Sequence, residues 1–221
     1  MQRFMQFLRP TSTALICGLL FAVLCMIPTT FTIDIGGYDS AYTQGFFDQE
    51  AIPPAFSTAG TARWSGTDAA IIIPQFAQPL TVSIRLRAPV AKQVTLLANG
   101  NTQVFTGVVD NAWQEITVPL SGGLTKPFTV FLAIQSDVGS WQAGDFRQVG
   151  VLVDDVTIST APGAWPYPWP VVWVVLVSLL AWFVFVPYTQ TPWRTAVISG
   201  SASILIALAS WRWQWWYRSE H

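Results

Sequence analysis

The sequence is poor in charge and in the residues that most enzymes use for catalysis. Only 10% of its 221 residues are charged, with 11 basic and 12 acidic side chains, against roughly 25% in soluble domains. The single histidine is the last residue, and the two cysteines lie near the amino terminus. These absences exclude a nucleic-acid binder, a disordered chain, and a Ser-His or Cys-His nucleophile in the middle of the chain.

The few charges are unevenly distributed. Residues 31–163 carry 11 acidic and 6 basic side chains, whereas the flanking segments carry 5 basic side chains and a single acidic one. Nine of the 12 tryptophans lie between Trp165 and Trp216. This partition is typical of a polar domain joined to membrane segments that have aromatic side chains at the lipid interface.

Residues 1–30 predict a cytoplasmic amino terminus followed by a transmembrane anchor. Arg3 and Arg9 precede an uncharged stretch, residues 11–28, which at about 1.5 Å per residue is long enough to cross a bilayer. The residues after this stretch lack the small-x-small pattern of a signal-peptide cleavage site, which favours a retained anchor. The basic residues place the amino terminus in the cytoplasm and the next domain outside the cell membrane.

Two further apolar segments predict transmembrane helices at residues 164–188 and 195–211. A cytoplasmic turn at residues 189–194 joins them, and an aromatic interfacial tail follows at residues 212–221. Aromatic side chains near the ends of these segments are expected to lie at the level of the lipid headgroups. They are Trp165, Trp169, Tyr188, Trp211, Trp213, Trp215 and Trp216. Small side chains would let a neighbouring helix approach the last segment closely. These small residues are Ala196, Ser199, Gly200, Ser203 and Ala207.

In residues 31–163 the apolar pattern changes to a period of two. The apolar side chains of Leu80, Val82 and Ile84 alternate with polar ones, as in a strand with one buried face. Asn99-Gly100 between two such runs predicts a hairpin. About eight short strands without helical periodicity predict an antiparallel β-sandwich or jelly roll. In the last strand the apolar phase shifts at Asp154-Asp155, which predicts either a β-bulge or burial of both faces of the strand.

The order of several short motifs resembles one bacterial module. Along the chain stand Thr32-Ile-Asp-Ile-Gly36, Arg63-Trp-Ser65, Leu86-Arg-Ala-Pro89 and Asp145-Phe-Arg-Gln-Val-Gly-Val-Leu-Val-Asp154. Together they resemble the extracytoplasmic galactose-binding-like jelly roll near the amino terminus of large polytopic membrane glycosyltransferases of bacteria. The resemblance covers about residues 11–186. It implies a β-sandwich outside the membrane, held between an anchor and a second helix.

The resemblance implies that the relatives continue into further membrane helices, and that acidic loops between those helices carry the transferase chemistry. After Asp155 the only acidic residue here is Glu220. We therefore expect this chain to lack the catalytic membrane region and to be no enzyme. The alternative is that it is a remnant of a longer glycosyltransferase.

Aromatic residues in two polar loops are the candidate ligand-binding residues. Jelly rolls of the type resembled hold glycans with exposed aromatic rings and with carboxylate or amide groups. The candidates are Tyr38, Tyr42, Trp141, Gln142 and Asp145. Two other tryptophans, Trp64 and Trp113, are expected in the core or at strand ends.

Charged residues of the domain are expected to serve its structure. Arg147 is expected to pair with Asp34 or Asp154 across strands. We expect no cofactor. A structural calcium ion is an alternative, with Glu50, Asp154 and Asp155 as weak candidates for its ligands.

The sequence predicts a multi-pass protein of the cell membrane with an all-β domain on the extracytoplasmic face. Its expected function is non-catalytic, as a glycan-recognition or accessory component of a membrane glycosyltransferase system. The alternative is a structural accessory subunit of a larger integral membrane complex, such as an energy-converting one. The expected partners are the lipid bilayer, other integral membrane proteins and a glycan, and not a nucleic acid.

Overall fold

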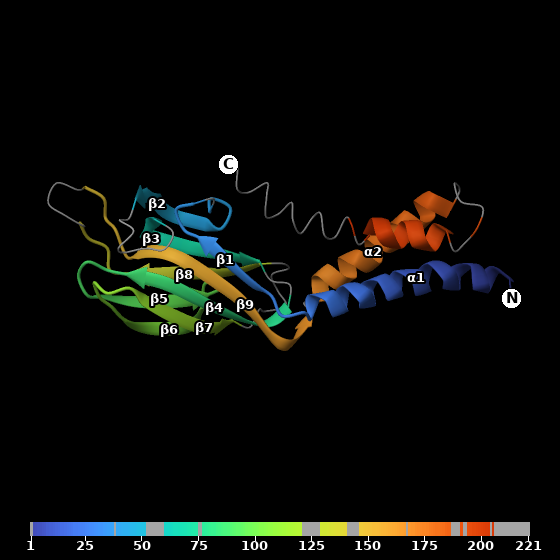
Figure 1. Cartoon of the computed structure of the whole chain (residues 1–221), viewed down its shortest axis with the longest axis horizontal. Helices are drawn as coiled ribbons and strands as arrows, with labels where there is room; N and C mark the ends of the chain where they lie inside the picture. The colour runs from blue at the N-terminus through green and yellow to red at the C-terminus, as the bar shows by residue number, and fades with distance from the viewer. Residues whose placement is uncertain are drawn as a thin grey trace.

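The protein consists of a β-sandwich and a helical unit that lie end to end (Figure 1). The computed structural model describes residues 2–37, 39–51, 60–74, 77–120, 129–140, 146–166, 168–186, 191, 194–203 and 205. The elements are α1 (Gln2–Cys25), β1 (Thr30–Asp34), β2 (Thr43–Ala51), β3 (Thr61–Pro74), β4 (Ala77–Arg87), β5 (Lys92–Ala98), β6 (Thr102–Val109), β7 (Gln114–Leu120), β8 (Thr129–Ser136), β9 (Leu152–Pro166) and α2 (Pro168–Phe185). Residues 194–203 are also helical, and we call them the third helical segment.

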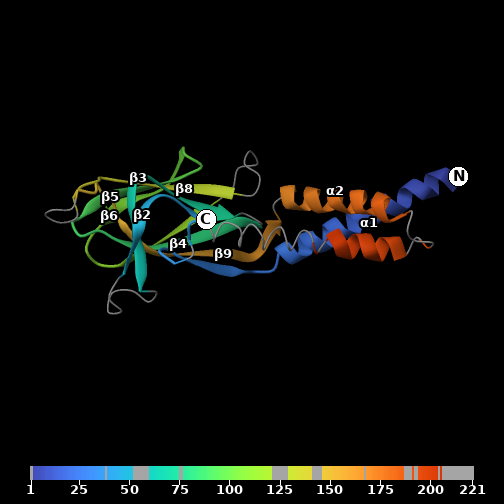
Figure 2. The same ribbon diagram turned by 90° about the horizontal axis from the view of Figure 1, so that it is seen from above.

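The described strands pair antiparallel throughout. They form one hydrogen-bonded sheet in the order β6-β5-β8-β3-β9-β4-β7, with β1 added to β9 and β2 added to β3. β3 and β9 share only two residue pairs, Arg63 with Val153 and Trp64 with Leu152. At this short link the sheet turns into two layers, β6-β5-β8-β3 and β7-β4-β9-β1, and Figure 2 shows β3, β5 and β8 on one side with β4 and β9 on the other. The predicted antiparallel sandwich is confirmed.

The core lies between the two layers and follows from the alternating sequence pattern. Val82, Ile84 and Leu86 of β4 are fully buried, and they pack in one cluster with Leu132 and Ile134 of β8. Burial of each such side chain contributes roughly 1.5–3 kcal/mol. The intervening side chains of β4 face outward, so this strand has one buried and one polar face.

Two local predictions for the strands are confirmed. Asn99 and Gly100 have φ angles of 52° and 85°, in the turn that joins the paired strands β5 and β6 as a hairpin. Arg85 pairs with Asp155 and Leu86 pairs with Val153, so Asp154 is the extra residue of a bulge in β9. The bulge explains why the apolar phase of the sequence shifts there.

The strands extend further than the expected domain boundary at residue 163. β9 continues to Pro166, and α2 begins at Pro168. At the other end, α1 begins at Gln2, well before the uncharged stretch that starts at Thr11.

Glycines lie at the closest contacts between the helices of the helical unit. A Cβ atom on Gly18 of α1 would lie 2.6 Å from Cγ2 of Val175 in α2. A Cβ atom on Gly200 would lie 3.1 Å from Sγ of Cys17. Glycine therefore sets the distance of α1 from α2 and from the third helical segment, and the three run side by side in Figure 2.

Several buried side chains in this interior are hydroxyls. Ser178 and Ser203 are buried and donate hydrogen bonds to carbonyl oxygens one turn earlier in their own helices, at 2.7 Å and 2.6 Å. Ser199 is also buried and donates to the carbonyl oxygen of Ala196 at 3.3 Å. These buried hydroxyls therefore need no water.

The outer surface of the helical unit is formed by large apolar side chains. Exposed examples are Leu15, Leu19, Val23, Trp173, Leu180, Phe183, Val197 and Leu205. Among the described residues, no helix combines the length and the apolar character that a bilayer crossing requires.

Candidate functional site

The loops that face away from the helical unit form the candidate site, and we call this part of the sandwich the distal end (Figure 1). Ala77 pairs with Pro166 beside α2, whereas Arg87, ten residues along β4, pairs with Leu152. The described residues of the distal end are 34–37, 39, 50–51, 60–64, 87–92, 109–114, 136–140 and 146–152.

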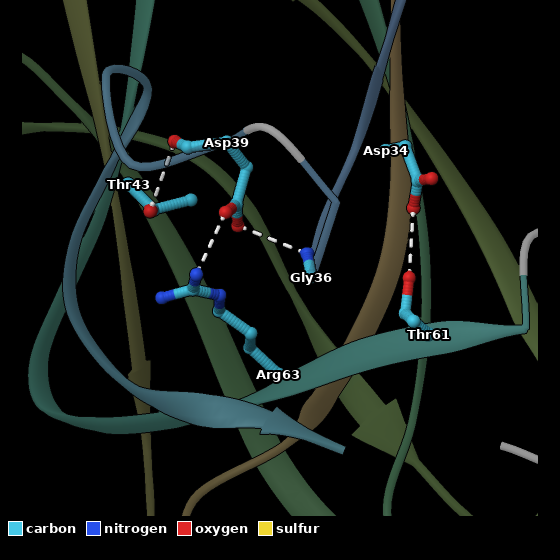
Figure 3. Close-up of polar contacts among 6 residues, drawn as sticks. All are labelled: Asp34, Gly36, Asp39, Thr43, Thr61 and Arg63. Atoms are coloured by element: carbon cyan, nitrogen blue, oxygen red, sulfur yellow. Dashed lines mark hydrogen bonds and ion pairs between the residues drawn. The ribbon is translucent and has the colours of Figure 1, made fainter. Parts of the chain in front are cut away.

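A buried ion pair fixes the chain that follows β1. Oδ1 of Asp39 lies 2.9 Å from Nη2 of Arg63, and the Asp39 carboxylate is fully buried. The Gly36 N–H donates to Oδ2 of Asp39 at 3.0 Å, and the Thr43 hydroxyl donates to the Asp39 carbonyl oxygen at 3.1 Å (Figure 3). Burial raises the pKa of Asp39, while the Gly36 N–H and the Arg63 guanidinium act in the opposite direction.

Gly36 is required where this chain crosses β3. Its φ angle is 104°, and a Cβ atom there would lie 2.9 Å from the amide nitrogen of Ala62. Only glycine combines this φ angle with such close contact to a neighbouring backbone. Beside it, the hydroxyl of Thr61 donates to Oδ1 of Asp34 at 3.3 Å (Figure 3).

A second ion pair joins β2 to the segment before β9. Nη1 of Arg147 lies 2.7 Å from Oε1 of Glu50, and Nε1 of Trp64 donates to Oε2 of Glu50 at 2.9 Å. The expectation that Arg147 pairs with Asp34 or Asp154 is therefore wrong. The register of β2 places Glu50 opposite Ala62 of β3, where it meets Arg147.

The two tryptophans expected to pack do so. Trp64 is buried in a small cluster with Val149 and Leu152, against which Trp113 packs. The guanidinium carbons of Arg85 and Arg87 each lie 5.1 Å from a ring centroid of Trp113. A tryptophan ring covered in this way is no open platform for a sugar.

A row of charged residues crosses the outer face of the β1-β9-β4-β7 layer. Asp34 pairs with Asp155, Asp155 with Arg85, and Arg85 with Glu115. The buried carboxylate of Asp154 lies 3.0 Å from Nη1 of Arg85. Burial, and then the charge of Asp154, raise the pKa of Asp155; burial and the Asp154 charge also raise the pKa of Asp34.

This row does not have the arrangement of a metal site. In the part of the chain that the structure describes, no three His, Cys, Asp or Glu side chains converge as ligands. Two of the candidate calcium ligands, Glu50 and Asp154, form ion pairs with Arg147 and Arg85.

We expect Asp155→Asn to raise the melting temperature at about pH 7, with a gain that shrinks toward pH 4. Because the pKa of Asp155 is raised on folding, the folded chain binds this proton more readily than the unfolded chain. The wild-type protein therefore gains stability from this group as the pH falls through the folded-state pKa, and it loses that gain as the pH rises. Thermal melting of both proteins across this pH range tests the expectation.

The matched control is Asp110→Asn, which should act with the opposite sign. The Ala112 N–H and the Gln114 side chain donate to Oδ1 of Asp110 and lower its pKa. The stability that this group adds is therefore present at neutral pH and is lost as the pH falls through its folded-state pKa. Shifts of equal sign in the two variants would contradict these assignments.

The structure places the candidate ligand residues as follows. Tyr42 is buried and lies against Phe31, with ring centroids 6.1 Å apart, so its ring is not open to a ligand as the loop position suggested. Outside the described residues lie Tyr38, Trp141, Gln142 and Asp145.

Phe146 is the aromatic residue that the sequence interpretation missed. Its side chain is 96% exposed, and it follows the loop that contains the Trp141, Gln142 and Asp145 candidates. The sequence does contain a signal for this exposure. Phe146 stands between the charged residues Asp145 and Arg147, outside any alternating apolar pattern that would predict a buried side chain.

The predicted membrane-interface and helix-packing residues also lie partly inside and partly outside the described part of the chain. Trp165, a candidate interface residue, is 74% exposed at the end of β9 that adjoins α2. Of the candidate helix-packing residues, Ser199, Gly200 and Ser203 are buried and Ala196 is partly buried. Outside the described residues or side chains lie Trp169, Tyr188, Ala207, Trp211, Trp213, Trp215 and Trp216.

Comparison with known proteins gives matches at the level of solved structures. No family model and no curated protein matches the chain. The C-terminal CBM6 of the laminarinase LamC from Zobellia galactanivorans is 15% identical, covering 60% of this chain and 100% of its own, with a TM-score of 0.39. The CBM35 of Abf62 from Cellvibrio japonicus is 13% identical, covering 59% of this chain and 92% of its own, also with a TM-score of 0.39. A likeness at this level carries no conclusion about what this chain binds.

Proposed function

We propose that this chain is a non-catalytic, membrane-anchored recognition protein whose distal end binds a glycan outside the cell membrane. The observation that supports this most strongly is the opposite character of the two ends of the molecule. The helical unit exposes large apolar side chains, whereas the distal end exposes the ring of Phe146 beside charged groups. The motif order that resembles membrane glycosyltransferases favours a role as an accessory component of such a system.

The side-chain distribution of the helical unit supports a lipid environment. A helical bundle in water buries large apolar side chains and exposes polar ones. Here the hydroxyls of Ser178, Ser199 and Ser203 are buried, while many large apolar side chains face outward. The interior also contains the apolar side chains of Phe21, Val174 and Trp182. Helices in lipid gain nothing from burying apolar groups, so they associate through small residues and satisfy hydroxyls internally. The proposal rests on these outward-facing apolar side chains and buried hydroxyls, and not on the length of any one helix.

The chemistry of the distal end supports a glycan as ligand. Sugar rings present C–H faces to aromatic rings and hydroxyls to charged groups. Phe146 supplies an uncovered ring, and the neighbouring Arg147 and Glu50 are only partly buried. The candidates Trp141 and Asp145 belong to the same connection between β8 and β9.

We expect Phe146→Ala to weaken glycan binding by the full chain about tenfold. Loss of one stacked ring costs about 1.4 kcal/mol, which is a factor of ten in affinity. The measurement is binding of the purified chain in nanodiscs to an array of neutral and acidic oligosaccharides.

The matched control is Trp165→Ala, which removes another exposed aromatic ring, 74% exposed, at the opposite end of the sandwich. We expect this variant to bind as the wild type does. The proposal fails if no oligosaccharide binds, or if the two variants lose affinity equally.

The alternative, a structural subunit of a larger membrane complex, drew its support from the small residues of the last apolar segment. Of those described, Ser199, Gly200 and Ser203 are buried in the same chain and Ala196 is partly buried, with Gly200 against Cys17 of α1. These contacts favour packing of this face within the chain over docking of a neighbouring subunit on it.

A further inference from the structure

The segment before β9 carries Phe146 and is attached to its neighbours by backbone hydrogen bonds. Val149 and Gly139 exchange two of them, each at 3.0 Å. The Gly150 N–H donates to the carbonyl oxygen of Ser65 in β3 at 2.7 Å. These bonds begin three residues after Phe146, so its ring is close along the chain to an anchored stretch of backbone.

A lysine side chain adds a further attachment. Nζ of Lys92, the first residue of β5, donates to the carbonyl oxygen of Val149 at 2.7 Å and to that of Gly150 at 3.0 Å. Hydrogen bonds from a charged donor are roughly twice as strong as neutral ones. Among the described residues β5 pairs its backbone with β6 and β8, so the Lys92 side chain supplies a link to the segment that strand pairing does not.

The surroundings of the ammonium differ from those of an ordinary surface lysine. Lysine side chains on a surface usually extend their charge into water. Here Lys92 is partly buried, and burial lowers its pKa, while the charge of Asp137 acts in the opposite direction. The two carbonyl oxygens and the Asp137 charge offset the loss of water around the ammonium, so its position is set by the protein.

The backbone that receives these bonds lies tightly against the sandwich. A Cβ atom on Gly150 would overlap the hydroxyl oxygens of Ser65 in β3 and Ser136 at the end of β8. A few residues earlier, Arg147 binds Glu50 of β2 at 2.7 Å. This stretch of chain is therefore bound to β2, β3 and β5.

We infer that Lys92 is a positioning residue of the proposed glycan site, whose ammonium keeps the Phe146 ring in one place for the ligand. The inference rests on the proposed function. Lys92 acts through the backbone of Val149 and Gly150 and not by touching the sugar. A ring that is held before binding loses less conformational freedom on binding, so more of the stacking energy appears as affinity.

Two substitutions of Lys92 separate the ammonium from the length of the side chain. Lys92→Met keeps an unbranched side chain and removes the charge and the N–H donors, whereas Lys92→Arg keeps both. The matched control is Gln93→Met at the next position of β5. Nε2 of Gln93 donates to Oγ1 of Thr106 in β6 at 2.9 Å, so this variant removes a side-chain hydrogen bond that joins β5 to β6 and not to the segment before β9.

A spin label on the segment reports its order without any ligand. The label is placed on Gln148→Cys, an exposed position, in the full chain in nanodiscs after replacement of the two native cysteines, and this labelled protein is the parent chain. We expect a mobile spectral component to appear in Lys92→Met. The spectra of Lys92→Arg and Gln93→Met should stay as in the parent chain.

The same proteins are then tested on the oligosaccharide array and by thermal melting. We expect Lys92→Met to bind about tenfold more weakly than the parent chain, because loss of one hydrogen bond from a charged group typically costs a factor of this size. Lys92→Arg and Gln93→Met should retain the parent affinity. A residue that only stabilised the fold would lower the melting temperature without loosening the label or weakening binding.

An equally ordered label in Lys92→Met and in the parent chain overturns the inference, whatever the array shows. Unchanged affinity of Lys92→Met despite a mobile label overturns it as well, and so does global unfolding of Lys92→Met while Gln93→Met stays folded. A mobile label in Lys92→Met, with no oligosaccharide bound by the parent chain, would leave Lys92 as the anchor of the segment and remove the proposed function.

Discussion

Arg63→Met is expected to destabilise the sandwich by roughly 3 kcal/mol, because it leaves the buried carboxylate of Asp39 without its counter-ion. Burial already raises the pKa of Asp39, and loss of the arginine charge raises it further. The loss of stability should therefore shrink as the pH falls and Asp39 becomes protonated. Urea denaturation of the full chain in mild detergent, across this pH range, measures both effects.

Two comparisons separate this effect from a general loss of packing. Arg147→Met breaks the partly exposed pair with Glu50, with side chains 36% and 31% exposed, and should cost under about 1 kcal/mol. The double variant Asp39→Asn with Arg63→Met removes the stranded charge and should be more stable than Arg63→Met alone. Equal losses of folding free energy in Arg63→Met and Arg147→Met would show that the buried ion pair contributes no more to stability than the partly exposed one.

Leu180→Arg is expected to reduce membrane integration about a hundredfold. Leu180 is 66% exposed on α2, so an arginine there would cost almost nothing in water. In the middle of a membrane helix an arginine costs about 3 kcal/mol, which corresponds to two orders of magnitude. Fractionation of expressed protein between carbonate-washed membranes and the soluble phase measures the change.

The control is Val108→Arg on the sandwich, where the side chain is 59% exposed on β6. A surface change of this kind normally alters stability by less than about 0.5 kcal/mol, so fractionation should stay at the wild-type value. If Leu180→Arg also fractionates as the wild type, the helical unit is not in lipid.

Features set by local patterns were predictable from the sequence. The alternation in β4 and the Asn99-Gly100 turn act over a few residues, and each specifies its geometry directly. The bulge at Asp154 was predictable for the same reason, because a phase shift of one residue in an apolar pattern has few other structural causes.

Features set by long-range register were not predictable. The pairing of Arg147 with Glu50 depends on two register shifts in β2, between Gln44 and Phe46 and between Phe46 and Gln49. No local signal fixes the number of residues that such shifts consume. The ion-pair partner could therefore be assigned only from the structure.

The candidate site shows the same limit. A polar loop suggested an exposed Tyr42, but its N–H donates to the Asp39 carbonyl and its carbonyl accepts from the Ile72 N–H. These bonds draw the residue back against β3 and into the core. Phe146 has no backbone partner of this kind among the hydrogen bonds that the structure gives, and composition alone does not distinguish the two aromatics.

The most direct test of the account is the accessibility of spin labels on the full chain in nanodiscs, at Leu180→Cys and at Val90→Cys after removal of the native cysteines. Both positions are strongly exposed, at 66% and 71%, so packing does not distinguish them. We predict that molecular oxygen, which concentrates in lipid, relaxes the spin label at Leu180 and that a water-soluble nickel chelate does not. At Val90 we predict the reverse. Equal access of the nickel chelate to both labels would contradict a lipid-embedded helical unit that carries the sandwich outside the membrane.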